Sequence, residues 1–424
     1  YLDALVRDLP SAPSLVERRI LLGTSGGFPL ALEHLVADWT RRGSASLALS
    51  LGGMSPDVPS LPGGTYHRLA GSLTDSLTPL ARLVLGMAAI LDRRIGELPL
   101  YALVGISVPQ ALAGIAELVT KGAMRDAEGE LEFTSPMTRA SAYLDVPGIL
   151  RQTVHAQVAD ILLARDAEGE DLPGLEVAWH CVRGGRSGRV APFLLRGARE
   201  AMIGGAPHEA ELALRSGLPL LLGMDRSRGL VLLAEVANDL SLWQESLDAM
   251  AMVQVVDEQL QPEITVWTAM ANDRLGRLAP DEQQAVVTTL AGIVHHPGTQ
   301  TAVRLEACHV LAGIVEALGT DPGWVDLLDT ISKSRPGEDD TYGTAKWLVT
   351  EARLHYTVGH LPEALVRLRE AESILQRTVP LSKFLAFTRM GIGAVECAMG
   401  NYSQALEPTL SAYRAGVRLD SKDL

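Results

Sequence analysis

The feature that most constrains this chain is an internal repeat of paired helical segments in its second half. In each copy, a small residue in the first segment is followed by a turn and then by an alanine early in the second segment. The turn positions are Gly205, Ser241, Gly359 and Gly400. Antiparallel helices need small side chains where their axes approach, and glycine where the turn requires a positive φ. The pattern predicts helical hairpins stacked into a tetratricopeptide-like (TPR-like) superhelix, with another type of helical repeat as the alternative.

Composition and periodicity both favour helices over sheets. Hydrophobic residues make up 47% of the chain and aromatic residues only 4%. The segment 361–375 carries leucine, isoleucine and alanine along one helical face, which is typical of a helix packed against its neighbours. We therefore expect an all-α fold.

Residues 77–148 show the order of elements found in a winged helix. A helix starts at Thr78 and Pro79, and Ser107 followed three residues later by Gln110 forms a capping-box sequence at the start of a later helix. The segment around 123–134 has the pattern of a short hairpin. The chain is thus predicted to be a winged-helix-like module with a small β-hairpin, followed by a TPR-like α-solenoid superhelix.

Charge and cysteine usage narrow the function classes. The net charge of −14 argues against a nucleic-acid-binding surface along the chain. Cys181, Cys308 and Cys397 lie far apart and form no zinc-ligand spacing, which is typical of a reduced, cytoplasmic protein. His180 beside Cys181 could form a thiol–imidazole pair, but a cysteine on a packed helix is usually a core residue.

Two further features concern the extent of the chain. No apolar run approaches the roughly 20 residues that a membrane-spanning helix needs, so we expect no membrane contact. The chain starts at Tyr1, inside a predicted helix, and we therefore expect it to be a piece of a longer protein.

Four short motifs occur in an order that resembles one family. Ser25–Leu30 contains a Gly-x-Pro sequence, and Phe133–Tyr143 has the form Phe-x-His-x-x-x-Arg-x-x-x-Tyr with serine at the histidine position. A helix with His155 near its start follows, and then Ala178–Gly184, which contains Ala-x-His-x-x-x-Gly. This order, with helical repeats behind it, resembles the STAND signalling ATPases, in particular the MalT-like or LuxR-type large transcriptional regulators.

The resemblance implies nucleotide contacts at three residues. Gly27 and Pro29 match the lid motif, in which the proline packs against the adenine. Ser135 stands where the family has a histidine that can contact phosphates; a serine can donate a hydrogen bond there but carries no charge. The alternative for Pro29 is an ordinary helix start with proline at its first position.

The resemblance also implies the domain order. The predicted parts are a helical lid remnant of an ATPase module at 1–55, a linker at 56–76, a winged-helix-like domain at 77–148, connecting helices at 149–190 and a TPR-like sensor at 191–424.

The cofactor prediction is negative for this chain. It contains no Gly-x-x-x-x-Gly-Lys-Ser/Thr loop, so we expect it to hold no cofactor and not to be an enzyme. ATP or ADP is implied only for a full-length protein.

The partner prediction places a small-molecule inducer or a protein partner on the concave face of the repeats. Glu351, Arg353 and His355 are expected to face outward there, beside packed Ala352 and Tyr356. The third helix of the winged helix has no arginine, so no direct nucleic-acid contact is expected, while self-association is expected from the resemblance. The alternative to a nucleotide-controlled regulator is a TPR-like protein–protein interaction scaffold.

Overall fold

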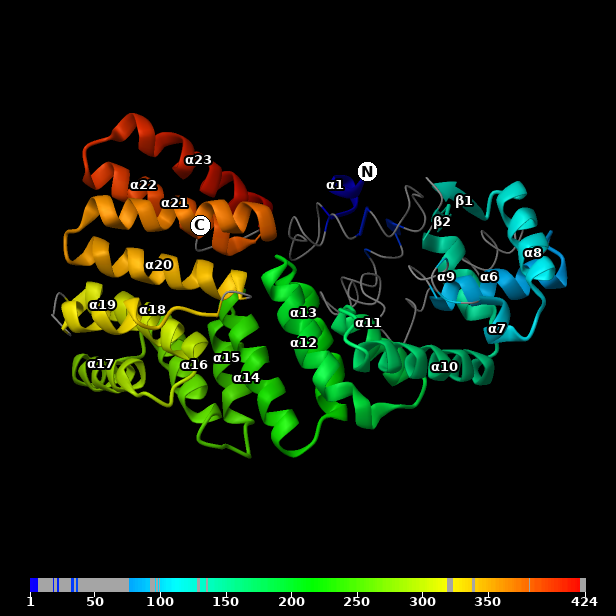
Figure 1. The fold of residues 1–424 in the computed structure, drawn as a ribbon, viewed down its shortest axis with the longest axis horizontal. Helices are drawn as coiled ribbons and strands as arrows, with labels where there is room; N and C mark the ends of the chain where they lie inside the picture. Colours follow the sequence, from blue (N-terminus) through cyan, green and yellow to red (C-terminus); the bar gives the residue numbers. More distant parts are fainter. Residues whose placement is uncertain are drawn as a thin grey trace. The chain divides into compact units, whose positions relative to one another are not determined.

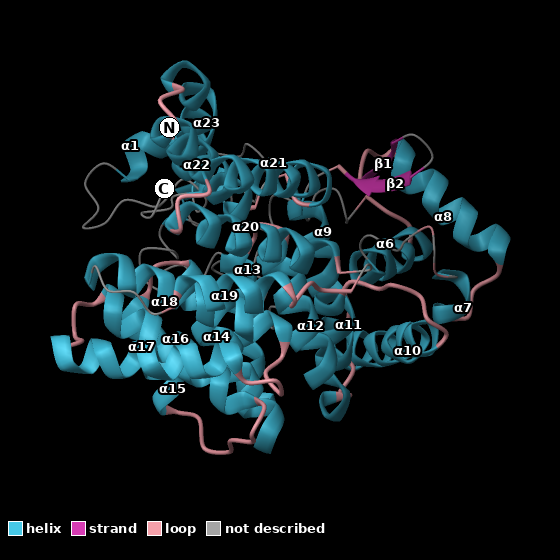
Figure 2. Cartoon of the chain, turned by 60° about the vertical axis from the view of Figure 1, so that its left-hand side comes forward, coloured by secondary structure: helices cyan, strands magenta, loops and turns pink. Residues whose placement is uncertain are grey.

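The computed structural model describes residues 1–6, 18, 21, 22, 32, 33, 36, 76–91, 96, 98, 100–127, 130–134, 136–318, 323–337, 340–380 and 382–419. Over these residues the chain is almost wholly helical, with a single antiparallel pair of strands (Figures 1 and 2). The expected all-α fold with a small hairpin is confirmed. The chain divides into two compact units, residues 1–197 and 198–424.

The first unit contains short and medium helices around the hairpin. Its elements are α1 (Leu2–Val6), α6 (Pro79–Leu91), α7 (Leu100–Val104), α8 (Val108–Thr120), β1 (Met124–Ala127), β2 (Glu130–Phe133), α9 (Pro136–Asp145), α10 (Gly148–Ala167), α11 (Gly174–Arg183) and the 3₁₀ turn Ser187–Arg189. Helix α12 (Val190–Ile203) crosses the division between the units.

Local capping and close packing fix the predicted three-helix and hairpin module. The backbone N–H of Ser107 donates to Gln110 Oε1 at 2.9 Å, as the capping sequence predicts. Glu117 on α8 accepts from the backbone and hydroxyl of Thr78 at 2.8 and 2.6 Å, so it neutralises the N-terminus of α6. A Cβ at Gly114 would lie 2.8 Å from Val84 Cγ2, which shows how closely α8 approaches α6.

The second unit is a succession of helical hairpins. Its elements are α13 (Pro207–Gly217), the 3₁₀ turn Leu218–Leu220, α14 (Gly223–Asp239), α15 (Trp243–Ala251), α16 (Leu260–Arg274), α17 (Pro280–His295), α18 (Thr301–Leu318), α19 (Trp324–Ser332), α20 (Thr341–Thr357), α21 (Leu361–Thr378), α22 (Lys383–Ala398) and α23 (Tyr402–Leu419).

The turn positions behave as the repeat predicts. Gly205, Gly359 and Gly400 have φ values of 83°, 86° and 81°. Ser241, which replaces glycine in its copy, has φ = 60° and is the one non-glycine residue with positive φ among the described residues. The L side chain at Ser241 is therefore held in a conformation that glycine adopts without steric cost.

Small residues let the hairpins pack closely. Ala352 of α20 and Ala364 of α21 are buried against one another's helices, and Leu368, Ile392 and Val395 extend the same apolar cluster to α22. This cluster explains why the two best sequence copies, α20–α21 and α22–α23, also pack on each other.

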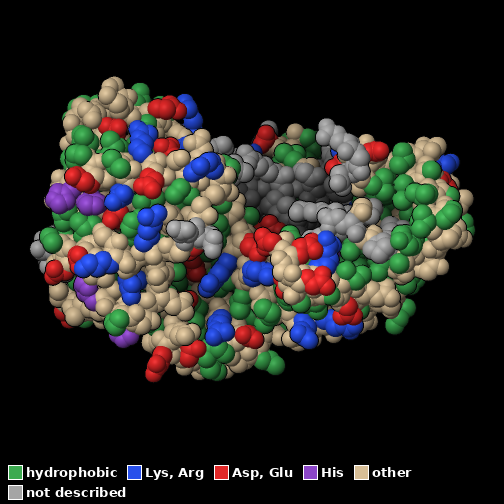
Figure 3. Space-filling view, viewed as in Figure 1, with side chains coloured by type: hydrophobic (Ala, Val, Ile, Leu, Met, Phe, Trp, Pro, Cys, Tyr) green, Lys and Arg blue, Asp and Glu red, His purple; other side chains and the backbone are tan. Residues whose placement is uncertain are grey.

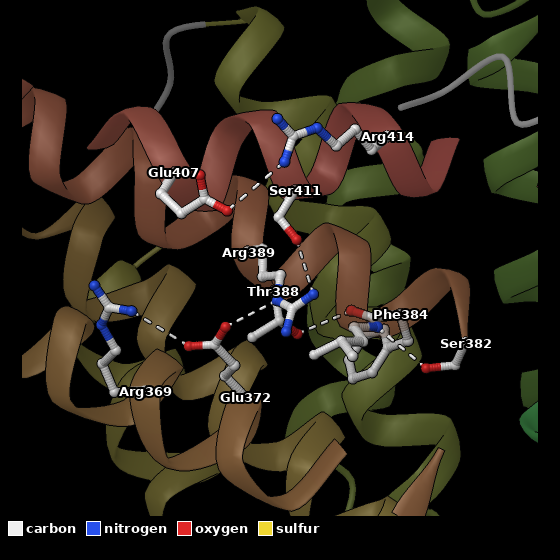
Figure 4. Close-up of polar contacts among 10 residues, drawn as sticks. Arg369, Glu372, Ser382, Phe384, Thr388, Arg389, Glu407, Ser411 and Arg414 are labelled. Carbon is white, nitrogen blue, oxygen red and sulfur yellow. Dashed lines mark hydrogen bonds and ion pairs between the residues drawn. The ribbon is translucent and has the colours of Figure 1, made fainter. Parts of the chain in front are cut away.

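A polar bridge joins the last three helices. Arg389 on α22 donates from Nε to Glu372 Oε1 of α21 at 2.8 Å and from Nη1 to Ser411 Oγ of α23 at 2.9 Å (Figure 4). One guanidinium thus holds both neighbours of α22 in register.

No helix among the described residues is long and apolar enough to cross a bilayer.

Candidate functional site

The three residues expected to contact nucleotide cannot be placed. Gly27, Pro29 and Ser135 lie outside the described residues. Their assignment remains a prediction from the family resemblance.

The prediction that Glu351 faces outward is wrong. Its side chain is buried, with the residue 3% exposed. Ser332 Oγ of α19 donates to its Oε1 at 2.7 Å, and Arg367 Nε of α21 lies 2.6 Å from its Oε2. Glu351 points toward the neighbouring helices, where Arg367 neutralises its charge and Ser332 donates a hydrogen bond to it.

The other two predicted residues on α20 also do not share one surface. His355 lies one turn beyond Glu351, with its ring centroid 5.7 Å from that of His360, and burial lowers its pKa. Arg353 instead donates from Nη1 to the His309 carbonyl oxygen of α18 at 3.3 Å. Tyr356, which was expected to be packed, is 40% exposed.

A different set of charged side chains on the first helices of successive repeats influences one another's pKa. Its members lie on five helices, α12, α14, α16, α18 and α20, and consecutive members are separated by several dozen residues of sequence. We call this set the first-helix cluster; it consists of Arg199, Glu235, Glu263, Glu306 and Lys346.

An ion pair forms one side of the first-helix cluster. Lys346 Nζ donates to Glu306 Oε1, and the two side chains keep 23% and 18% of their accessible area. Burial acts to raise the pKa of Glu306, but the Lys346 ammonium outweighs burial and the pKa lies below its ordinary value. The same carboxylate keeps the pKa of Lys346 above its usual range although burial opposes this.

Glu235 has a different environment from Glu306. It makes no hydrogen bond or ion pair with any described residue. Burial raises its pKa to about 7, and the carboxylates of Glu306 and Glu263 act in the same direction against Lys346 and Arg199. At neutral pH the Glu235 side chain is thus divided between its charged and neutral forms.

A second contact crosses the same unit. Lys383 at the start of α22 donates from Nζ to the Asp239 carbonyl oxygen at 2.5 Å and lies 3.8 Å from the Asp239 carboxylate. Asp239 ends α14, so this contact ties together two first helices that are separated by several hairpins.

In the first unit, three of the motif segments converge on His155. Tyr143 Oη lies 2.9 Å from His155 Nε2, and His155 Nδ1 lies 3.0 Å from His180 Nδ1. The Trp179 ring meets His155 edge-on, with the centroids 4.7 Å apart. Residues from Phe133–Tyr143, from the start of α10 and from Ala178–Gly184 therefore form one buried aromatic and imidazole group.

His155 is neutral in this setting. Burial lowers its pKa to about 2, and His180 and the nearby arginines, including Arg183, add to the effect. A neutral imidazole has one donor and one acceptor nitrogen. The two contacts are both satisfied when Tyr143 donates to Nε2 and the Nδ1–H of His155 donates to His180.

Glycine at the end of α11 allows this convergence. A Cβ at Gly184 would lie 2.5 Å from Ala156 Cα and 2.6 Å from its backbone nitrogen. Any side chain there would push α11 away from α10. The glycine of the Ala-x-His-x-x-x-Gly motif is therefore needed for the close approach of the two helices.

Catalytic and metal chemistry find little support in the described residues. Cys181 is buried, and burial raises its pKa to about 11, so the thiol stays protonated. No group of three or more His, Cys, Asp or Glu side chains that could hold a metal ion occurs in the part of the chain that the structure describes.

The exposed face of α8 is apolar. Val108, Leu112 and Val119 are 46%, 60% and 39% exposed. Hydrophobic side chains gather where α8 lies, and basic and acidic side chains intermingle elsewhere on the viewed face (Figures 1 and 3). Reading of DNA by a helix requires arginine or lysine at base edges and phosphates, which this face does not provide.

Comparisons with known proteins give structural likeness only. No family model matches the sequence, and no curated protein does. The chain is similar to the crystal structure of a STAND protein with a tetratricopeptide repeat sensor from Pyrococcus horikoshii, with a TM-score of 0.49 and 13% identity over 97% of this chain. It spans 61% of the length of that protein. It is also similar to BtubC (BKLC) from P. vanneervenii, with a TM-score of 0.29 and 19% identity over 56% of this chain and 92% of that one.

Proposed function

We propose that this chain is the regulatory part of a STAND-type signal-transduction ATPase that acts as a transcriptional regulator. The helical repeats bind an inducer or a protein partner, and the winged-helix-like module with the helices behind it couples that binding to the nucleotide state. The chain itself is not an enzyme in this proposal, since its sequence has no phosphate-binding loop.

The observation that carries the proposal is the convergence of separate motif segments on His155. The motif residues Tyr143, His155 and His180 come from different helices and contact one another. Motif segments that follow one another in the sequence thus contact one another in the fold. That unit lies between the winged-helix-like module and the start of the repeats along the chain.

The proposed mechanism has two states. In the resting state ADP holds the lid and the winged-helix-like module against an ATPase core, with Gly27 and Pro29 as lid contacts and Ser135 near the phosphates. A ligand on the repeats favours release of this clamp, nucleotide exchange and self-association. The ligand can do so only if its affinity differs between the two states.

DNA binding belongs elsewhere in this proposal. The apolar exposed face of α8 suits a structural module, so a further domain of the longer protein would contact DNA.

The second candidate is a TPR-like scaffold without nucleotide control. The first-helix cluster favours it, because a binding site on the repeats needs no ATPase core. Binding a partner on such a scaffold does not require a buried aromatic and imidazole group in contact with the winged-helix-like module.

The test uses the whole polypeptide encoded by the gene. We expect its reading frame to contain a phosphate-binding loop before the lid motif and the purified protein to bind ADP. His155→Gln should speed ADP release about 10-fold, which corresponds to ~1.4 kcal/mol of coupling, while His295→Gln on the exposed end of α17 leaves it unchanged. The proposal would be contradicted if the purified protein bound no ADP. It would also be contradicted if both variants and the wild type released ADP at the same rate.

A further inference from the structure

Helix α23 carries an apolar stripe that faces solvent. The helix packs against α22, and Ala405 and Ala412 on its other side are buried (Figure 1). Large hydrophobic side chains recur on the exposed side every three or four residues, which places them along one face of the helix. We call them the α23 stripe; they are Tyr402, Leu406, Leu410 and Tyr413.

The preceding hairpin buries the corresponding positions in a helix–helix interface. Leu361 and Leu365 follow the turn glycine Gly359 at the spacing at which Tyr402 and Leu406 follow theirs. Leu361 and Leu365 are half-buried, because they pack against the apolar cluster that joins α21 to α22. Tyr402 and Leu406 instead keep 72% and 61% of their accessible area. The α23 stripe thus holds the positions and the residue types of a contact between hairpins, on an exposed surface.

The first helix of the same hairpin shows the same difference. Val349 of α20 also packs against the cluster that α20 and α21 share with α22. The residue of α22 that precedes its turn glycine at the same spacing is Met390, and it is exposed. Both helices of the α22–α23 hairpin therefore expose hydrophobic side chains where the hairpin before it buries them. Contiguous exposed apolar surface of this kind marks a site of protein–protein contact.

The charges beside the α23 stripe favour a second α23 helix as the partner. Glu407 and Arg414 lie two turns apart along one edge of the stripe, and both are exposed (Figure 4). Arg414 Nη1 lies 3.9 Å from Glu407 Oε1, close to the limit of an ion pair. When two identical helices pack antiparallel about a twofold axis, each edge meets the same edge of the other helix, running in the opposite direction. The acidic position of one copy then meets the basic position of the other, twice.

We propose that α23 packs antiparallel on α23 of a second copy of this chain through the α23 stripe. Burial of the apolar side chains supplies the attraction, and the two pairs of Glu407 with Arg414 between the copies fix the direction. The inference rests on the proposed function for the step of self-association, and it names the surface that performs that step.

The experiment is sedimentation equilibrium of this chain from about 1 to about 100 µM, a range over which weak specific dimers form. The mass should rise with concentration from the 45.3 kDa of one chain toward twice that value. A chain that stays monomeric over the whole range would overturn the proposal and would leave a helix of another protein as the occupant of the stripe.

Two leucine variants locate the contact. Leu406→Ser should weaken the dimer at least 10-fold, whereas Leu112→Ser on the apolar face of α8 leaves it unchanged. The two leucines are a matched pair, since they are 61% and 60% exposed and both lie within helices. Because both side chains are exposed, neither change should lower the melting temperature by more than a surface substitution does. Equal dimerisation of Leu406→Ser and the wild type would overturn the proposal.

Charge reversal tests the pairing between copies. Glu407→Arg and Arg414→Glu should each weaken the dimer about 5-fold, because each puts two like-charge pairs in the interface. An equimolar mixture of the two variants should associate as the wild type does, since every pair between the copies is then of opposite charge. A mixture as weak as its components would contradict the antiparallel contact.

These results are separate from those that test the proposed function. Dimerisation through α23 needs only this chain and no nucleotide. A dimer that Leu406→Ser abolishes, in a protein whose whole polypeptide binds no ADP, would reject the STAND proposal and keep the contact. Binding of ADP by a protein whose α23 stripe makes no dimer would reject the contact alone.

Discussion

The environment of Glu235 makes a quantitative prediction about folding stability. The pKa of Glu235 in the folded chain is about 7, against 4.5 for an ordinary glutamate. A shift of one unit corresponds to about 1.4 kcal/mol, so the fully charged side chain lowers the free energy of unfolding by roughly 3 kcal/mol.

The sign follows from proton binding. Between pH 4.5 and 7 the folded state holds a proton on Glu235 that the unfolded state has released. The favourable contribution of the neutral form is fully present below pH 4.5 and is lost as the pH rises through about 7. Glu235→Gln removes this loss, so the variant should gain stability over the wild type by about 2–3 kcal/mol between pH 5 and pH 8.

The assay is urea unfolding followed by far-ultraviolet circular dichroism at pH 5, 6, 7 and 8. Glu258→Gln, in an exposed position, should track the wild type within about 0.5 kcal/mol at every pH. A difference between Glu235→Gln and wild type that does not change with pH, or a variant less stable at pH 8, would refute the reasoning.

Three further predictions follow from the backbone and the sequence. Ser241→Gly should raise the free energy of unfolding by about 1 kcal/mol because it relieves the positive φ, and Gly359→Ser should lower it by a similar amount, both measured by thermal denaturation. Gly184→Ala should destabilise the chain by about 1–3 kcal/mol because the new Cβ meets the Ala156 backbone, whereas Gly188→Ala, which meets nothing within 4 Å, should lie near the wild type; equal effects would contradict the close approach. This chain should release no phosphate from ATP in a colorimetric assay, and micromolar ATP affinity by calorimetry would contradict the absence of a phosphate-binding loop.

The sequence predicts the hairpins best where the backbone conformation of the turn fixes which residue can stand there. Positive φ at Gly359, Gly400 and Ser241 follows from the turn itself, which any antiparallel helix pair must make. The helices α16, α17, α18 and α19 are not predicted by the repeat pattern. Their glycines with positive φ, Gly276 and Gly323, were the available signal, but the flanking helices lack the alanine spacing of the better copies.

The site is predicted less well because it depends on which helices meet. Glu351 and Arg353 are two residues apart and so point to different sides of α20, and only the neighbouring helices decide which side is closed. The first-helix cluster joins residues such as Arg199 and Lys346 from distant segments, and no local pattern marks them. The convergence on His155 involves motifs visible in the sequence, but their contact and the neutrality of the imidazole emerge only from packing.

The contact between Lys383 and Asp239 changes the mechanics of the repeat array. In a linear solenoid each hairpin touches only its neighbours, so a displacement passes from one to the next and the array can open in pieces. Here α22 is bonded to the end of α14, 144 residues earlier in the chain. The helices between them therefore form a segment whose two ends are in direct contact. If two neighbouring hairpins within this segment move apart, the contact between Lys383 and Asp239 is strained. Movement at the ammonium of Lys383 therefore reaches α14 directly, and α14 is the helix that carries Glu235.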